Sequence, residues 1–358
     1  MRSINHTLRR FKFIDFGLIT LVLVLLSGCA SADNTKESPS VSNGSDKEVQ
    51  LVIGAYSVVK DALGELLPAF KAEWKARTGQ NIVYQESYEA SSTQARSIIA
   101  GFQADVTLLA MEGDVDKLVR AELVDPNWNA GALRGMITRS IVVLGTREGN
   151  PLGIRDFDDL KRSDVKVLYP NPKTSGGAQW DINAIYGAGL KYSEKEMGKR
   201  DPEVAKHFLA DVHRNIESMD KSGRASMAAF EYGVGDVIVT YENELLARIA
   251  QGKKYDIVIP SSTILIENPA VVVSRNADQH GVREVADAFI AYLYSAEAQE
   301  IFVKHGFRSV DEKVASAHVD QFPTPSELFD IAYLGGWDEV RNTLYSKRGV
   351  WYQVLAGL

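Results

Sequence analysis

The sequence predicts an α/β protein made of two lobes with a cleft between them. From residue 49 onward, strand-like apolar runs such as residues 106–110 alternate with amphipathic helical segments such as residues 62–77. In the latter segment the large apolar residues recur at the three- and four-residue spacing of one helix face. Strands that alternate with helices form a mostly parallel sheet flanked by helices. Ligands bind beside the carboxyl ends of such strands and between domains, so the cleft is the candidate site.

The alternation passes through two cycles, and this predicts the limits of the lobes. The first lobe comprises residues 49–138 together with residues 263–358, which include a helical, aromatic-rich carboxy-terminal tail. The second lobe comprises residues 139–262. Crossing strands near Arg139 and Ile264 are expected to form the hinge.

Residues 1–29 have the features of an export signal. A positively charged start precedes residues 17–26, an apolar run shorter than the roughly 20 residues of a comfortable membrane span. The run ends in Leu-Ser-Gly-Cys, which resembles a bacterial lipobox, with cleavage before Cys29 and a lipid on that residue. Cys29 is the only cysteine of the chain, so it has no intramolecular disulfide partner. An uncleaved anchor or a plain secretory peptide is the alternative.

Residues 30–48 are rich in Ser, Asn, Asp and Lys and have almost no apolar side chains. Such a segment cannot bury enough surface to offset its ordering entropy, which predicts a flexible tether. Acyl chains and a tether would attach the protein to a membrane surface without spanning it. The net charge of −7 argues against a nucleic-acid partner, which needs a basic surface. A single anion can still be held by local dipoles.

Four loops share one design, in which a strand is followed by small polar residues and the start of a helix. They are residues 55–57, 90–92, 174–177 and 221–223. Small residues allow backbone N–H groups to approach a ligand closely. The first N–H groups of a helix have no internal partner and lie at the positive end of its dipole. A serine at a helix start is usually only an N-cap, but four such ends together predict a site for a small anion.

Three other kinds of function fit the sequence less well. A nucleophilic Ser91 or Ser175 would need a positioned base, and none of the six histidines falls in the four loops. Glu242 and Glu244 are two residues apart and would not face each other on a helix, which favours ion pairing over a metal site. Aromatic residues of the tail could form an adhesive patch, but their spacing favours packing. We therefore expect no enzyme, no cofactor and no metal.

Several segments, taken in chain order, resemble the bacterial periplasmic sulfate- and thiosulfate-binding proteins. The most distinctive is Asn-Pro-Lys-Thr-Ser-Gly-Gly-Ala-Gln-Trp at residues 171–180. The resemblance extends from about residue 49 to residue 337, and its other segments are residues 91–96, 103–106, 149–154, 235–237 and 241–244. It implies the two-lobed periplasmic-binding-protein fold and delivery of an oxyanion to the permease of an ABC importer.

The resemblance also implies how the anion is held. The family binds dehydrated sulfate with backbone amides, a serine hydroxyl and an indole N–H. Carried over by position, the ligand-binding residues are Ser57, Ser91, Ser175, Gly176, Gly177, Gly223 and Tyr241, where Ser91 supplies the hydroxyl and Tyr241 replaces the indole. A phenol can also donate one hydrogen bond. The protein is expected to be a monomer, exported and lipid-anchored at the periplasmic or cell-surface side of a membrane.

The choice of oxyanion stays open between sulfate, thiosulfate, molybdate, tungstate and phosphate, and the partner could be a signalling receptor instead of a permease. A site made only of donors suits sulfate, because phosphate near neutral pH keeps a proton that needs an acceptor. The carboxylates adjacent to the loops are Glu89 and Asp220. We expect Asp220 to be structural and Glu89 to point away from the donors, so that phosphate is rejected.

Overall fold

The structure is a computed structural model that describes residues 48–357. The export signal, Cys29 and the tether up to residue 47 lie outside the described residues. Within residues 48–357, no helix has both the length and the apolar character that a membrane span requires.

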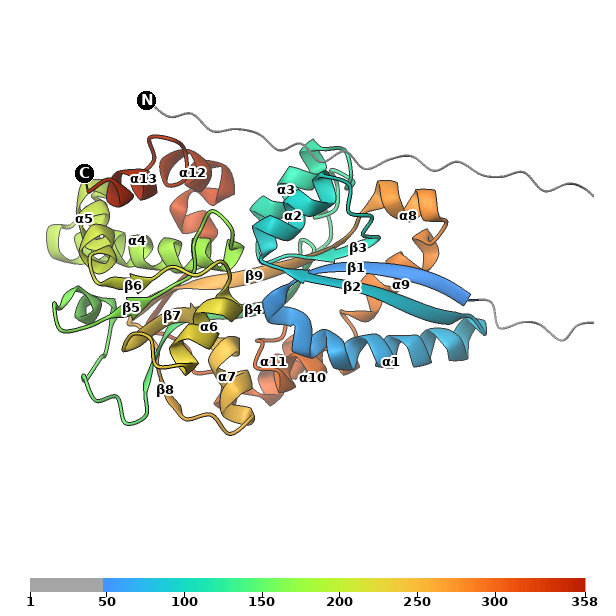
Figure 1. Ribbon diagram of the computed structural model, residues 1–358, viewed down its shortest axis with the longest axis horizontal. Helices are drawn as coiled ribbons and strands as arrows, with labels where there is room; N and C mark the ends of the chain where they lie inside the picture. Colours follow the sequence, from blue (N-terminus) through green and yellow to red (C-terminus); the bar gives the residue numbers. More distant parts are fainter. Residues whose placement is uncertain (1–47, 358) are drawn as a thin grey trace, which may run out of the picture. The chain divides into compact units, whose positions relative to one another are not determined.

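Two long antiparallel strands connect the two halves of the fold (Figure 1). They are β4 (Met136–Arg147) and β9 (Ser262–Val272), which contain Arg139 and Ile264 respectively. The first half of β4 pairs with the middle of β9. Its second half pairs with β7 (Val237–Tyr241) and β8 (Tyr255–Val258), which belong to the second lobe. The lobe limits at residues 138 and 263 therefore remain a proposal that places the hinge within these two strands.

One group of strands forms the first lobe, in the order β2-β1-β3 followed by the end of β9. β1, β2 and β3 are parallel, and β9 adds to β3 in the antiparallel sense. The elements of this lobe are β1 (Glu48–Tyr56), η1 (Ser57–Val59), α1 (Lys60–Thr78), β2 (Asn81–Glu89), α2 (Ser91–Ile99), β3 (Val106–Leu108), α3 (Glu112–Arg120), α8 (Ser274–His280), α9 (Arg283–Tyr292), α10 (Ala296–Lys304) and α11 (Glu312–Ala317).

The second lobe continues the sheet as β4-β7-β5-β6, with β8 also paired to β4. Its elements are η2 (Phe157–Lys161), β5 (Val167–Leu168), α4 (Gly176–Met197), α5 (Pro202–His213), β6 (Ile216–Ser218), α6 (Gly223–Glu231), β7 (Val237–Tyr241), α7 (Glu242–Ala250) and β8 (Tyr255–Val258). The sheet is mixed, not mostly parallel as predicted, because β4 and β9 run antiparallel to each other, β9 runs antiparallel to β3, and β4 runs antiparallel to β7 and β8.

The tail after α11 is less helical than predicted, and it packs mainly on the second lobe although the prediction grouped it with the first. Its elements are η3 (Val319–Gln321), β10 (Glu327–Phe329), η4 (Ile331–Leu334), α12 (Gly336–Thr343) and α13 (Val350–Leu355). β10 pairs with the start of β9, and α12 and α13 lie beside α4 and α5 in Figure 1. Helix α12 also contacts α3 of the first lobe. Phe329 and Trp337 are buried, as the aromatic spacing indicated, although Phe329 lies in a strand.

The contact between Phe329 and Gly187 gives a stability prediction. Gly187 lies within α4, and a methyl group there would overlap the buried ring of Phe329. Gly187→Ala should therefore lower the free energy of unfolding by about 1–3 kcal/mol, as overpacking does. The exposed Gly64 in α1 has nothing within 4 Å of an added Cβ, so Gly64→Ala should stabilise by about 0.5–1 kcal/mol. Urea unfolding measures both, and equal stabilisation of the two variants would contradict this packing.

Candidate functional site

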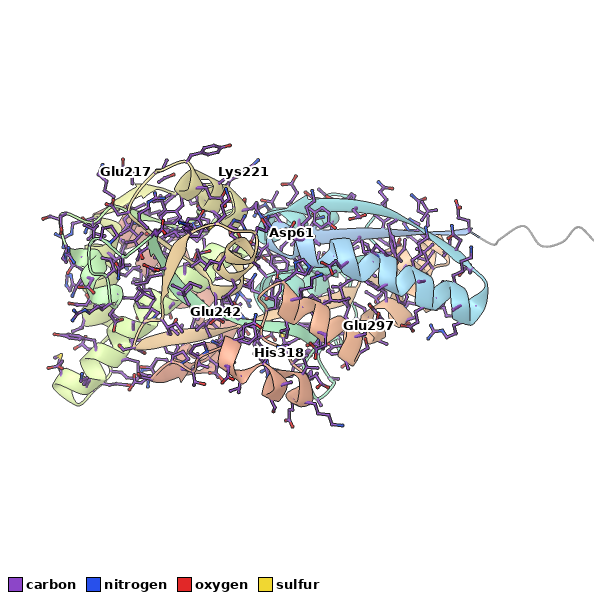
Figure 2. All side chains as sticks on the ribbon, turned by 90° about the horizontal axis from the view of Figure 1, so that it is seen from below. Asp61, Glu217, Lys221, Glu242, Glu297 and His318 are labelled. Carbon is purple, nitrogen blue, oxygen red and sulfur yellow. The ribbon has the colours of Figure 1, made fainter. Side chains whose placement is uncertain are left out.

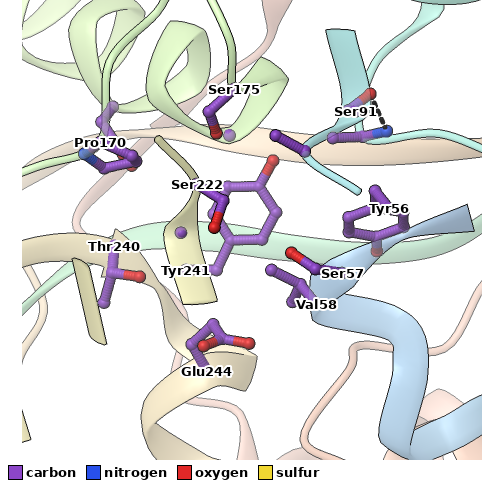
Figure 3. Close-up of a pocket in the computed structure, with 15 residues that line it drawn as sticks. Tyr56, Ser57, Val58, Ser91, Pro170, Ser175, Ser222, Thr240, Tyr241 and Glu244 are labelled. Atoms are coloured by element: carbon purple, nitrogen blue, oxygen red, sulfur yellow. Dashed lines mark hydrogen bonds between the residues drawn. The ribbon is translucent and has the colours of Figure 1, made fainter. Parts of the chain in front are cut away.

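One small enclosed cavity lies between the lobes (Figure 3). Its wall is built from the ends of β1 and β7 and the starts of several helices. The lining residues are Tyr56, Ser57, Val58, Ala90, Ser91, Ala110, Pro170, Ser175, Gly177, Asp181, Ser222, Gly223, Thr240, Tyr241 and Glu244. The volume open to the centre of a water-sized sphere is about 20 Å³. A cavity needs about 10–15 Å³ on this measure to hold one water molecule, so only a very small ligand fits.

The structure brings the predicted site residues together. Six of the seven line this cavity, and they come from all four predicted loops and from the end of β7. Gly176 lies directly behind the wall, where an added Cβ would be 3.0 Å from Asp114 and 3.2 Å from Ser91.

The first turns of α2, α4 and α6 converge on the cavity from both lobes. The Gly176 and Gly177 amides begin α4, and none of the cap, turn or loop hydrogen bonds of the described residues uses them. The same holds for the Gly223 amide at the start of α6 and the Ser91 amide at the start of α2. These N–H groups are donors without a partner inside their helices. The cavity is thus surrounded by the positive ends of three helices.

Two serine hydroxyls and one phenol add side-chain donors. Ser175 and Ser222 are N-caps that accept hydrogen bonds from Ala178 N at 3.3 Å and Ala225 N at 3.1 Å, which leaves their own protons free. Figure 3 shows Ser175 and Ser222 among the residues that line the cavity together with Tyr241. The Tyr241 hydroxyl is buried and has no hydrogen-bond partner among the described residues.

The hydroxyl of Ser91 has a different role from the one carried over from the family. It donates to Asp114 Oδ2 at 2.6 Å and accepts from Ala110 N at 2.9 Å, the bond dashed in Figure 3. A hydroxyl has one proton, and in this structure Asp114 receives it. The Ser91 side chain therefore fixes the cavity wall, and Ser175 is the serine whose hydroxyl remains free to donate.

Direct contacts hold the two lobes closed over the cavity. Arg224 on α6 pairs with Asp61 on α1 at 3.0 Å, and Figure 2 shows Asp61 at the end of α1 that faces the second lobe. The Trp180 indole on α4 donates to Ala110 O at 2.7 Å, and Arg96 on α2 donates to Lys173 O at 3.2 Å. The structure therefore represents the closed form, in which a ligand would be shielded from water.

Two carboxylates that the sequence analysis did not place at the site line the cavity. Glu89 is exposed and lies outside the cavity wall, and Asp220 accepts hydrogen bonds from Ser218 and Ser226, as expected of a structural residue. The expectation that these were the carboxylates to consider was nevertheless wrong, because Asp181 and Glu244 face the cavity. Asp181 was foreseeable, since it follows Gly177 by four residues and helical side chains four apart share one face.

The two carboxylates differ in how their charge is compensated. Glu244 is paired with Arg248 at 3.3 Å and with Arg224 at 3.7 Å. Asp181 is 1% exposed and makes no hydrogen bond or ion pair with the described residues. Burial raises the pKa of the Asp181 carboxyl well above its usual range. Burial also raises the pKa of Tyr241, with smaller contributions from the charges of Tyr56, Asp181 and Asp114, so its phenol stays protonated.

The remaining acidic candidates form ion pairs. Glu242 is held by Arg308 through two contacts of 2.6 and 2.9 Å, which agrees with the expected salt bridging. Within residues 48–357, no group of three or more His, Cys, Asp or Glu residues is arranged to hold a metal ion. No Lys, Arg or His belongs to the described residues that line the cavity.

These features define a two-lobed binding protein with a small, amide-lined cavity. The chain belongs to the family of bacterial extracellular solute-binding proteins, whose family profile matches residues 51–308. It is similar to the sulfate-binding protein of Synechococcus elongatus, with 36% identity over 355 residues and 98% of each chain covered. The sulfate-binding protein of Escherichia coli is 37% identical over 314 residues, which cover 86% of this chain and 93% of that protein.

A solved structure supports the same relationship. The sulfate-binding protein SubI from Mycobacterium tuberculosis matches with a TM-score of 0.76 and 35% sequence identity, covering 84% of this chain and 100% of that chain. The family resemblance and the two-lobed fold predicted from the sequence are thereby confirmed.

The buried contact between Ser91 and Asp114 can be tested without a ligand. Ser91→Ala removes a donor to a fully buried carboxylate that is also paired with Lys117. Hydrogen bonds to charged groups contribute about 1.5–3 kcal/mol, and we expect a loss of this size in urea unfolding of the ligand-free protein. Ser316→Ala, which removes an exposed hydroxyl in α11, is the control and should change little. An unchanged stability of Ser91→Ala would contradict the assigned role.

Proposed function

We propose that the protein captures sulfate outside the cytoplasm and delivers it to an ABC importer. The observation that carries the proposal is the cavity itself, where N–H donors from three helix N-termini and O–H donors from Ser175, Ser222 and Tyr241 surround a space for one small ion. Helix N-termini bind anions without a cationic side chain. The relatives named above as sulfate-binding proteins support the choice of ligand.

The proposed complex uses Ser57, Ser91, Gly176, Gly177 and Gly223 as amide donors, together with the hydroxyls of Ser175 and Tyr241. Sulfate near neutral pH has no proton, so each of its oxygens only accepts hydrogen bonds. Charge-assisted hydrogen bonds to an oxyanion are stronger than neutral ones, and the closed lobes exclude competing water. Binding and transport require no bond to be made or broken, and we propose no catalytic role for the chain.

Phosphate is the second candidate, because the cavity contains a carboxyl group. An ionised Asp181 could accept the proton of hydrogen phosphate, whereas a protonated Asp181 acts as one more donor and suits sulfate. Burial, which raises the pKa of Asp181, favours the protonated form. Sulfate is therefore the proposed ligand. Thiosulfate, molybdate and tungstate are further oxyanions that the titration below distinguishes.

Calorimetric titration of the purified protein with these five anions tests the ligand, and Gly177→Ala tests the site. An added Cβ at Gly177 would lie 3.3 Å from Ser175 Oγ and 3.6 Å from Tyr241 Oη, so the fold tolerates it but the methyl group enters the cavity. We expect sulfate to bind the wild type and the affinity of Gly177→Ala to fall at least about ten-fold, or about 1.4 kcal/mol.

The control is Gly64→Ala, which adds the same methyl group at an exposed helix position outside the cavity lining and should bind sulfate normally. Normal sulfate binding by Gly177→Ala would show that the ion sits elsewhere. Tight binding of phosphate and none of sulfate by the wild type would overturn the sulfate assignment.

We further propose that the mature protein is a monomer attached to the outer face of a membrane through a lipid on Cys29. The lipobox-like Leu-Ser-Gly-Cys sequence and the apolar run before it support this proposal. A membrane anchor would keep the protein near its permease or, as the alternative, a signalling receptor. Gel filtration with light scattering measures the oligomeric state.

The anchor predicts a difference between wild type and Cys29→Ser. When both are expressed in bacteria, the wild type should partition into the detergent phase of a Triton X-114 extract, because acyl chains carry it there. Cys29→Ser should remain in the aqueous phase. Detergent partitioning that survives the substitution would instead indicate an uncleaved apolar anchor.

A further inference from the structure

Asp181 is a buried carboxyl group for which the proposed sulfate site has no evident use. It lies in the second turn of α4, at the wall of the cavity, and 1% of its surface is exposed. One of its oxygens is buried without any hydrogen-bond partner among the described residues. An unpartnered buried polar atom is costly, so a group of this kind is expected to interact with what enters the cavity.

The groups around Asp181 give no positive charge to balance an ionised carboxylate. Tyr169, Tyr345 and Tyr241 lie close enough for its charge to raise their pKa values further, after the larger effect of burial. Tyr56 and Glu244 also line the cavity, and the charge of Glu244 is already compensated by two arginines. Asp114 lies behind Ser91 and is paired with Lys117. None of the described cations contacts Asp181.

A sulfate ion in this cavity would face Asp181, and the protonation state of the carboxyl decides whether that contact is favourable. Sulfate oxygens and carboxylate oxygens are both acceptors, so no hydrogen bond forms between the two anions, and they repel each other. A carboxylic acid has one O–H donor, which matches a sulfate oxygen.

We propose that Asp181 is protonated in the sulfate complex and donates its proton as a hydrogen bond to the ion, so that the complex holds one carboxyl proton for each sulfate. This inference rests on the proposed function. The proton stays on the Asp181 carboxyl, and no bond of the sulfate changes. In the free protein burial raises the pKa of this carboxyl, and the bound dianion raises it further. Above the free-state pKa, the proton is drawn from solvent on binding.

Infrared difference spectroscopy of the protein with and without sulfate reads the carboxyl group directly. The sulfate complex of the wild type should show the C=O band of a protonated carboxylic acid, which shifts in D₂O, and the complex of Asp181→Asn should lack it. Asn is the neutral isostere with an N–H donor, so Asp181→Asn should still bind sulfate. Asp320→Asn, which makes the same change at an exposed position, should keep the band.

The pH dependence of the sulfate affinity is the second readout. Sulfate binding requires the proton of Asp181, and the free protein loses this proton as the pH rises through the pKa of that carboxyl. The sulfate affinity of the wild type should therefore fall by up to about ten-fold per pH unit above this pKa. The affinity of Asp181→Asn should stay constant.

Two results would overturn the inference and leave the proposed function intact. One is a sulfate complex of the wild type without the carboxylic acid band, and the other is loss of sulfate binding by a folded Asp181→Asn. A wild type that binds no sulfate at any pH would overturn the proposed function itself. If Asp181→Asn does not fold, the wild-type band and its shift in D₂O decide alone.

Discussion

The site depends on backbone N–H groups that cannot be satisfied within their own helices. The first turn of every helix leaves such donors, and in this fold α2, α4 and α6 begin beside the same cavity. Glycines at the starts of α4 and α6 keep these amides uncovered, since any side chain at Gly177 would occupy the space itself. Because α2 belongs to one lobe and α4 and α6 to the other, the donor set is complete only when the lobes are closed.

Closure therefore has to coexist with two carboxyl groups in the cavity wall, those of Asp181 and Glu244. Two unit charges about 4 Å apart interact by about 4 kcal/mol at an effective dielectric constant of about 20, so an uncompensated carboxylate would strongly oppose an anion. The fold compensates Glu244 with Arg224 and Arg248, and Arg224 also pairs with Asp61 across the lobes. Asp181 has no such cation among the described residues, so in the proposed sulfate complex a proton neutralises its charge instead.

The sequence was sufficient to predict the fold class and the family, and the residues that it suggested for the site lie together. Periodic apolar residues and small polar loops are local signals, and Gly176 and Gly177 are recognisable without a structure. The partner of a hydroxyl is not a local signal. Ser91 donates to Asp114, which is 23 residues away in the sequence, so its role could not be assigned by position. Glu244 lies in the cavity wall because β7 ends at the cavity and α7 begins directly after it. The position of β7 depends on the order of strands in the sheet, which is not a local signal. Asp181 was not predicted, because only the carboxylates next to the loops in the sequence were considered. Its spacing of four residues from Gly177 nevertheless places both residues on one helix face.

The central claim is that one small tetrahedral dianion is held by helix N-termini inside the closed cavity. A crystal structure with selenate tests this claim most directly, because selenium scatters anomalously and selenate matches sulfate in shape and charge. The account predicts one anomalous peak within hydrogen-bonding distance of the Gly177 and Gly223 amides and the Ser175 hydroxyl. Selenate bound only outside the cavity, with the cavity filled by water or empty, would contradict it.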